Sequence, residues 1–146
     1  MYLAQMNLAI LRHPLDDPRM ADFIARLDEI NLLAERSPGF VWRFKAEGGH
    51  ALDIRPYPDE RVVVNMSVWE GIEPLFEYTY YSDHVQVFRR RRDWFEAYPK
   101  PHQVLWYVPP GHEPTVEEAE ARRQHLAEYG PTPHAFDFKH RLPPES

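Results

Sequence analysis

One predicted helix places a histidine and an arginine on a single face. The segment from His84 to Tyr98 follows a Ser-Asp pair that can cap a helix and precedes a proline that ends it. Residues three, four or seven positions apart share one side of a helix, so His84 and Arg91 lie together. Phe88 and Phe95 fall on the same side and make it mostly apolar. The imidazole could act as a general base or a haem ligand, and the guanidinium could hold an anionic or enolate oxygen.

Both residues also have purely structural interpretations. His84 stands at the start of the predicted helix, where its ring can bond to the backbone or to solvent. Arg91 could instead form an ion pair with Glu70, Asp53 or Glu96. The sequence leaves these alternatives open.

Two predicted strands, Tyr2–Leu11 and Arg61–Glu70, carry polar side chains with a period of two. Because alternate residues of a strand point to the same side, these polar residues should share one face of the sheet. Asn65 could polarise a carbonyl, and Asn7 could do the same, although such residues also tie sheet backbone to loops. The residues on this face are Gln5, Asn7, Asn65, Ser67 and Trp69.

If the helix face and the sheet face meet, they enclose a mostly apolar pocket with a few polar groups. That is the usual composition of a small-molecule site. The predicted catalytic residues are His84 as the base, with Arg91 and Asn65 as partners of the oxyanion. The residues predicted to contact the substrate are Asn7, Trp69, Tyr80, Phe88, Trp94 and Phe95.

The remaining patterns predict the elements that hold these residues in place. A capping box, Thr115 followed by Glu118, begins a helix that ends before Gly130. Expected strands are 2–11, 40–46, 61–70, 102–109 and 134–139, and expected helices are 18–36, 71–81, 84–98 and 116–129.

This order predicts an α+β, ferredoxin-like split βαβ sandwich: an antiparallel sheet with helices on one face. We expect a single domain over residues 1–146, with a C-terminal helix-strand extension. The opposite face carries Val62, Val64, Met66 and Val68, which are too apolar to leave in water. Pairing of two such faces would give a homodimer, as in a dimeric α/β-barrel assembly.

Composition excludes several classes of function. The 146 residues carry a net charge of -6, which argues against binding nucleic acid. The absence of cysteine excludes disulfides and thiolate chemistry, and the eight histidines show no metal-ligand spacing. No apolar run is long enough to span a membrane and no signal peptide is evident, so a cytoplasmic protein is expected.

Several motifs resemble known families. SVWE after an apolar strand, followed by an aromatic helix and a Ser-Asp-His step, resembles the dimeric α/β-barrel superfamily, which includes antibiotic-biosynthesis and haem-degrading monooxygenases. PLDDPRM, SPGFVWR, RRRRDWF, VLWYVPPGHEPTVEEA and GPTPHAFDF resemble the uncharacterised domain-of-unknown-function family 3291 over nearly the whole chain. The resemblance to haem-degrading members implies roles for Asn7, Trp69 and His84, which follow the same order along the chain.

These observations favour an enzyme that removes a proton beside a carbonyl of a hydrophobic aromatic or polyketide-like substrate. Oxygen insertion could follow, as in a cofactor-independent monooxygenase, or the reaction could resemble that of a cyclase or isomerase. No cofactor is predicted. The alternatives are haem binding or degradation through His84, a non-catalytic small-ligand module with the same pocket, and a structural dimer with a filled core.

Overall fold

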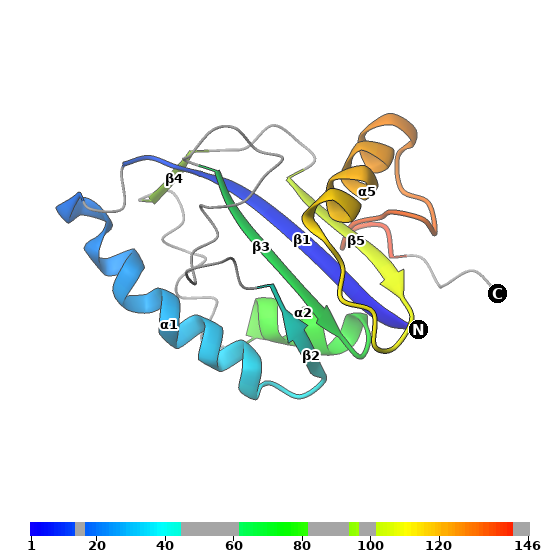
Figure 1. The fold of residues 1–146 in the computed structure, drawn as a ribbon, viewed down its shortest axis with the longest axis horizontal. Helices are drawn as coiled ribbons and strands as arrows, with labels where there is room; N and C mark the ends of the chain where they lie inside the picture. Colours follow the sequence, from blue (N-terminus) through cyan, green and yellow to red (C-terminus); the bar gives the residue numbers. More distant parts are fainter. Residues whose placement is uncertain (14–16, 45–61, 82–93, 97–101, 142–146) are drawn as a thin grey trace.

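The computed structural model describes residues 1–13, 17–44, 62–81, 94–96 and 102–141, which form a mixed α+β fold (Figure 1). In chain order the elements are β1 (Tyr2–Leu11), the 3-10 helix η1 (Pro18–Met20), α1 (Ala21–Arg36), β2 (Phe40–Arg43), β3 (Val62–Trp69), α2 (Ile72–Tyr81), β4 (Phe95–Glu96), β5 (Gln103–Val108) and α5 (Val116–Tyr129).

The long strand β1 lies at the centre of an antiparallel sheet. The strand order is β2-β3-β1-β4. Strand β5 pairs with the N-terminal part of β1, on the same edge of β1 whose C-terminal end pairs with β4. With β5 as the fourth strand, this is the ferredoxin-like order. The predicted fold class is therefore confirmed.

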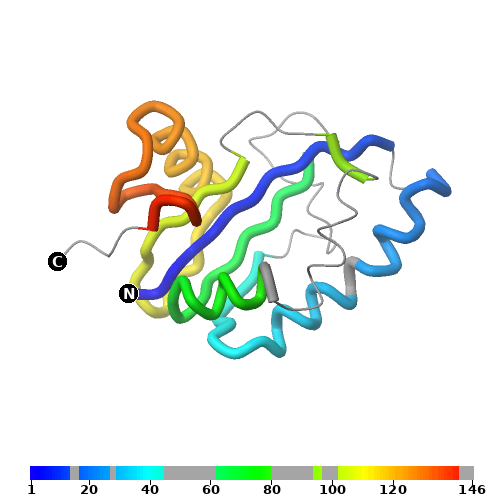
Figure 2. The backbone as a smooth tube through the Cα atoms, turned by 180° about the vertical axis from the view of Figure 1, so that it is seen from behind, coloured from blue at the N-terminus to red at the C-terminus, as the bar shows by residue number. Residues whose placement is uncertain are grey.

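Helix α2 lies over one face of the sheet, and α1 runs along the edge formed by β2 (Figure 2). Leu75 of α2 and Ala34 of α1 pack against Leu3 and Trp69 at one end of this face. At the other end, Met20 and Phe23 pack against Leu11 and Trp94. The face that carries Gln5 thus lies toward these two helices.

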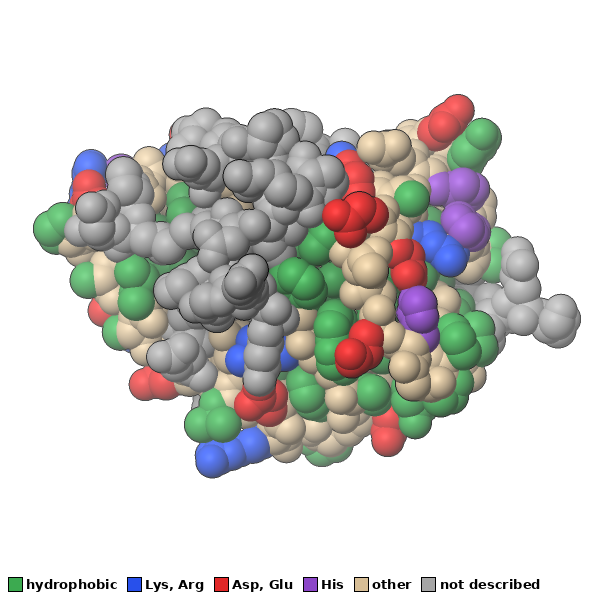
Figure 3. All heavy atoms as spheres, viewed as in Figure 1, with side chains coloured by type: hydrophobic (Ala, Val, Ile, Leu, Met, Phe, Trp, Pro, Cys, Tyr) green, Lys and Arg blue, Asp and Glu red, His purple; other side chains and the backbone are tan. Residues whose placement is uncertain are grey.

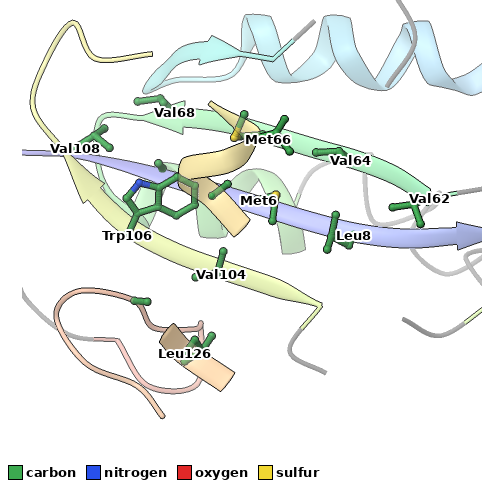
Figure 4. Packing of buried hydrophobic residues seen from close by; sticks show 14 residues of the cluster. Met6, Leu8, Val62, Val64, Met66, Val68, Val104, Trp106, Val108 and Leu126 are labelled. Carbon is green, nitrogen blue, oxygen red and sulfur yellow. The ribbon is translucent and has the colours of Figure 1, made fainter. Parts of the chain in front are cut away.

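The opposite face is the larger apolar core, and α5 packs on it. Val116, Ala119 and Leu126 of α5 join the apolar side chains of β1, β3 and β5 (Figure 4). The predicted open face is not open: Val62, Val64, Met66 and Val68 are at most 7% exposed within the single chain. The argument that this face must pair with a second copy to leave water is therefore wrong.

Local signals set the helix ends where the sequence placed them. The Thr115 side chain accepts a hydrogen bond from the Glu118 backbone N–H at 3.1 Å, as expected of a capping box. Gly130 ends α5 with a φ of 73°, a conformation that favours glycine. Asp17 caps η1 by accepting from the Arg19 N–H at 2.8 Å.

Two predicted elements differ from the structure. The helix expected to reach Tyr98 does not include Phe95 and Glu96, which form β4 and pair with Leu11 and Ile10. Pairing with β1 outweighs the helical pattern there. The expected strand 134–139 is replaced by turns with isolated bridges, of which Leu105 to Phe136 ties the segment to β5.

Candidate functional site

The strand registers align polar side chains in rows on the face toward α1 and α2. Residues directly opposite each other in antiparallel strands point to the same side of the sheet. The predicted sharing of one face is thereby confirmed. Trp69, Leu3 and Tyr107 form the first row; Ser67, Gln5 and Leu105 form the second; Asn65, Asn7 and Gln103 form the third.

We call the polar members of these rows the amide floor: Gln5, Asn7, Asn65, Ser67 and Gln103. Its second row is buried, with Gln5 4% and Ser67 7% exposed. In the third row, Asn65 is exposed while Asn7 and Gln103 are half-buried. The side chains of the floor are therefore buried in the second row and more accessible in the third. All of them are uncharged.

Gln5 is the centre of a hydrogen-bond network within the floor. Its Nε2 donates to Asn65 Oδ1 at 2.7 Å and to Ser67 Oγ at 2.9 Å. The indole Nε1 of Trp69 donates to the same Ser67 oxygen at 2.8 Å. Buried polar groups need such partners, because an unpaired one costs about 1–3 kcal/mol.

An aromatic wall stands at the Trp69 end of the floor. The Trp69 ring packs against Phe40 of β2 and Tyr78 of α2, with ring centroids 5.5 Å and 5.1 Å away. The Tyr78 hydroxyl donates to the backbone oxygen of Ile30 in α1 at 3.3 Å. Burial raises the pKa of Tyr78, so its phenol stays protonated and neutral.

A second apolar group closes the opposite end. Trp94 is 1% exposed and contacts Phe23, whose ring also meets Phe95 edge-on at 5.1 Å. Phe95 pairs with Leu11, eight positions from Leu3 on β1, which corresponds to about 27 Å along a strand. Trp94 and Phe95 therefore flank the amide floor at the end far from Trp69.

Strand β2 places a charged side chain at the margin of the site. Arg43, opposite Ser67 in the β2–β3 register, donates from Nε to Glu35 Oε1 of α1 at 2.9 Å. A groove of about 520 Å³ follows this edge of the sheet, and its lining includes Phe40, Trp42 and Glu113. Because Phe40 also contacts Trp69, the groove adjoins the aromatic wall.

The structure brings together only part of the predicted site. Asn7, Asn65 and Trp69 share the floor and its wall, as described above. His84, Phe88 and Arg91 lie outside the described residues. Tyr80 belongs to α2, but its side chain is also outside the description.

Four contributors were missed by the sequence-based site prediction. Gln5 and Ser67 were placed on the correct face but given no role, although the period of two already grouped Gln5 with Asn7 and Ser67 with Asn65. Gln103 shares the parity of Leu105 and Tyr107 in β5, which was a usable signal. Tyr78 could not be identified, because its contact with Trp69 depends on how α2 packs.

Within the described ranges, no group of three or more His, Asp or Glu side chains could hold a metal ion. In the same part of the chain, no helix is long and apolar enough to cross a membrane.

Comparison with known proteins agrees with the fold. A family model described as a domain of unknown function, DUF3291, matches residues 2–146. Among solved structures, SnoaB, a cofactor-independent oxygenase from Streptomyces nogalater, is similar with a TM-score of 0.53 at 14% identity, over 80% of this chain and 98% of that one. A mutant of SnoaB matches with a TM-score of 0.52 at 13% identity, over 78% and 98% of the two chains. No curated protein matches the sequence.

Proposed function

The chain belongs to the DUF3291 family, and from that premise and its amide floor we propose that it is a small-molecule enzyme. It removes a proton beside a carbonyl group of a hydrophobic aromatic or polyketide-like substrate, in the manner of a monooxygenase. The observation that carries this proposal is an uncharged hydrogen-bonding floor between two aromatic groups, facing the helices. A cofactor-independent oxygenase of the same fold supports it.

The floor suits a substrate with a planar apolar body and a carbonyl oxygen. The half-buried ring of Tyr78 can pack against the body, and the buried ring of Trp69 supports Tyr78 from behind. Asn65, exposed in the third row, can donate to the oxygen. Donors aimed at an oxygen stabilise it most when it gains negative charge, so they favour the enolate over the ketone.

The proton itself needs a base, which the uncharged floor does not supply. We assign this role to His84 and a second contact with the enolate oxygen to Arg91, both from the sequence alone. When oxygen is the second substrate, the overall change at the reacting carbon is CH2 + O2 → C=O + H2O. Four electrons leave the carbon, one oxygen atom enters it, and the other leaves as water.

A bound cofactor is not required by this chemistry, because the enolate itself supplies the electrons. Haem binding through His84 is the alternative, and a haemin titration distinguishes the two. We expect no sharp Soret shift with the purified protein; a shift that disappears in His84→Ala would favour haem. A ligand that binds but is never converted under oxygen would favour a non-catalytic binding module.

The proposal is tested with anthrone, an aromatic ketone whose acidic CH2 group is conjugated to the carbonyl through the aromatic rings. Loss of a proton from this CH2 group therefore places negative charge on the carbonyl oxygen, as it does in an enolate formed beside a carbonyl. We expect oxygen uptake and quinone formation above the uncatalysed rate. Loss of one oxyanion donor typically lowers kcat by about 10²–10³-fold, so Asn65→Ala should fall in that range.

The matched control is Gln124→Ala, which removes an amide from α5, the helix that packs on the opposite face of the sheet. It should leave the rate unchanged. No oxygen uptake by the wild type with anthrone or other enolisable aromatic ketones, or equal effects of the two substitutions, would contradict the proposal.

We also propose that the protein acts as a homodimer. The resemblance to dimeric α/β-barrel proteins supports this, as do exposed apolar side chains on α1 and β2: Ile24, Leu32 and Val41.

A further inference from the structure

We propose that Gln5 is a positioning residue that sets which end of the Asn65 amide faces the substrate. This inference rests on the proposed function, because it concerns the same floor. Through Gln5, the site presents hydrogen-bond donors, and it therefore selects a substrate oxygen that becomes negative.

The first step is the direction of each hydrogen bond. An indole N–H can only donate, so Ser67 Oγ accepts from Trp69 at 2.8 Å. The Gln5 amide nitrogen carries two hydrogens, and it uses them on Ser67 Oγ and on Asn65 Oδ1. Both acceptor sites of the Ser67 hydroxyl are then occupied, which leaves its own hydrogen to donate.

The second step follows from the geometry of an amide. With Oδ1 of Asn65 turned to Gln5, the Nδ2 group on the opposite end points away from this contact. Among the described residues, neither Asn65 Nδ2 nor the Ser67 hydroxyl donates to a protein acceptor. Because Asn65 is exposed and Ser67 is buried, the Asn65 Nδ2 group is the donor available to an oxygen placed over the floor.

The third step is the reverse arrangement. If Gln5 turned its amide by half a rotation, Oε1 would accept from Asn65 Nδ2 and from the Ser67 hydroxyl. Asn65 would then present its carbonyl oxygen, and an enolate above it would be repelled. A half rotation of an amide exchanges the positions of its oxygen and its nitrogen. The orientation of Gln5 therefore decides whether Asn65 presents a hydrogen-bond donor or an acceptor to the substrate.

Gln5 is suited to this task by its burial. It is 4% exposed, and its row neighbours are Ser67 and the fully buried Leu105. Asn65 is exposed, and an exposed amide turns freely unless a partner restrains it. The buried amide can thus hold the accessible one in a single orientation.

The test uses 4-nitrophenol, a planar phenol whose phenolate oxygen stands for the enolate and whose ionisation is visible by absorbance. A donor-lined site should lower the pKa of the bound phenol below that of the free phenol, by about 1. Gln5→Met should abolish most of this lowering, and so should Asn65→Ala. If Gln5 acts through Asn65, the double variant should be no worse than either single variant.

Gln124→Met on α5 is the matched control and should behave as the wild type. Additive effects of Gln5→Met and Asn65→Ala, or no effect of Gln5→Met, would overturn the positioning role while the pocket proposal stands. Binding that is unchanged in Trp69→Phe and Asn65→Ala would place the probe elsewhere and overturn both.

A second measurement needs no variant, in case Gln5→Met does not fold. In side-chain amide NMR spectra of the wild type, adding 4-nitrophenolate should shift the Asn65 Nδ2 signals. The Gln5 signals should barely move, because those hydrogens stay within the sheet. The opposite pattern would overturn the inference.

Discussion

At the scale of single residues, the site is defined by neutral groups with fixed directions. Ser67 is buried and takes two hydrogen bonds on one oxygen, from Gln5 and Trp69. Trp69 thereby serves the packing and the polar network at once. Its indole ring lies among aromatic rings while its N–H orders the neighbouring hydroxyl.

Tyr78 leads to a prediction about how the stability of the fold depends on pH. Burial raises its pKa, so the phenol is held protonated in the folded protein. A raised pKa contributes stability that is present below the unfolded value of about 10 and is lost as the pH rises above it. We expect the melting temperature to fall less between about pH 8 and pH 10.5 in Tyr78→Phe than in the wild type.

Tyr129→Phe is the control, because Tyr129 is 64% exposed. Its melting temperature should follow the wild type over the same pH range. An identical pH dependence of Tyr78→Phe and wild type would show that the phenol ionises as easily in the fold as outside it.

At the scale of elements, α5 and the segment after it form a unit on β5. Arg122 donates from one nitrogen to the His134 backbone oxygen at 2.9 Å and contacts its ring at Nδ1. Beyond this contact, Leu105 and Phe136 exchange two backbone hydrogen bonds. Figure 3 shows histidine side chains gathered on the side of the molecule where α5 lies. The segment after α5 therefore contributes to both faces of the sheet: Ala135 joins the core under α5, and Phe136 packs with Leu3 and Trp69 on the face of the candidate site.

The turn between α1 and β2 lies close to α2, and this contact leads to a prediction about stability. Gly39 has a φ of 81°, and a Cβ there would lie 2.5 Å from Pro74 Cβ in α2. Gly39→Ala therefore adds a clash to the strain of about 1–3 kcal/mol that a left-handed alanine carries. We expect a lower free energy of unfolding, measured with urea.

Gly111→Ala is the control that measures the backbone strain of a left-handed alanine without a clash. Gly111 has a φ of 89°, but a Cβ there would meet nothing within 4 Å. Gly39→Ala should therefore be the more destabilising of the two. Equal losses would mean that α2 does not press on this turn.

At the scale of the whole molecule, the sheet separates two tasks. The face with Met6, Met66 and Trp106 is a dry core, closed within one chain by α5 and its neighbours. The face with the amide floor keeps polar side chains between apolar ends. The larger apolar core and the proposed chemistry therefore occupy opposite sides of the same strands.

The proposed homodimer is tested at this scale by light scattering coupled to size exclusion. The chain has a mass of 17.4 kDa, and we expect a species of about twice that mass that persists on dilution. A single-chain mass at every concentration would contradict it. Because Val62, Val64, Met66 and Val68 are buried within one chain, such a dimer need not hide that face.

Sequence alone determined what depends on neighbouring residues. The Thr115 cap, the Gly130 end and the parity that groups Gln5 with Asn7 all follow from local spacing, because caps and pleats are local geometry. Only the tertiary structure decided that Phe95 joins a strand, that α5 closes the apolar face, and that Gln5 donates rather than accepts. Each of these depends on partners far along the chain, whose positions no local pattern encodes.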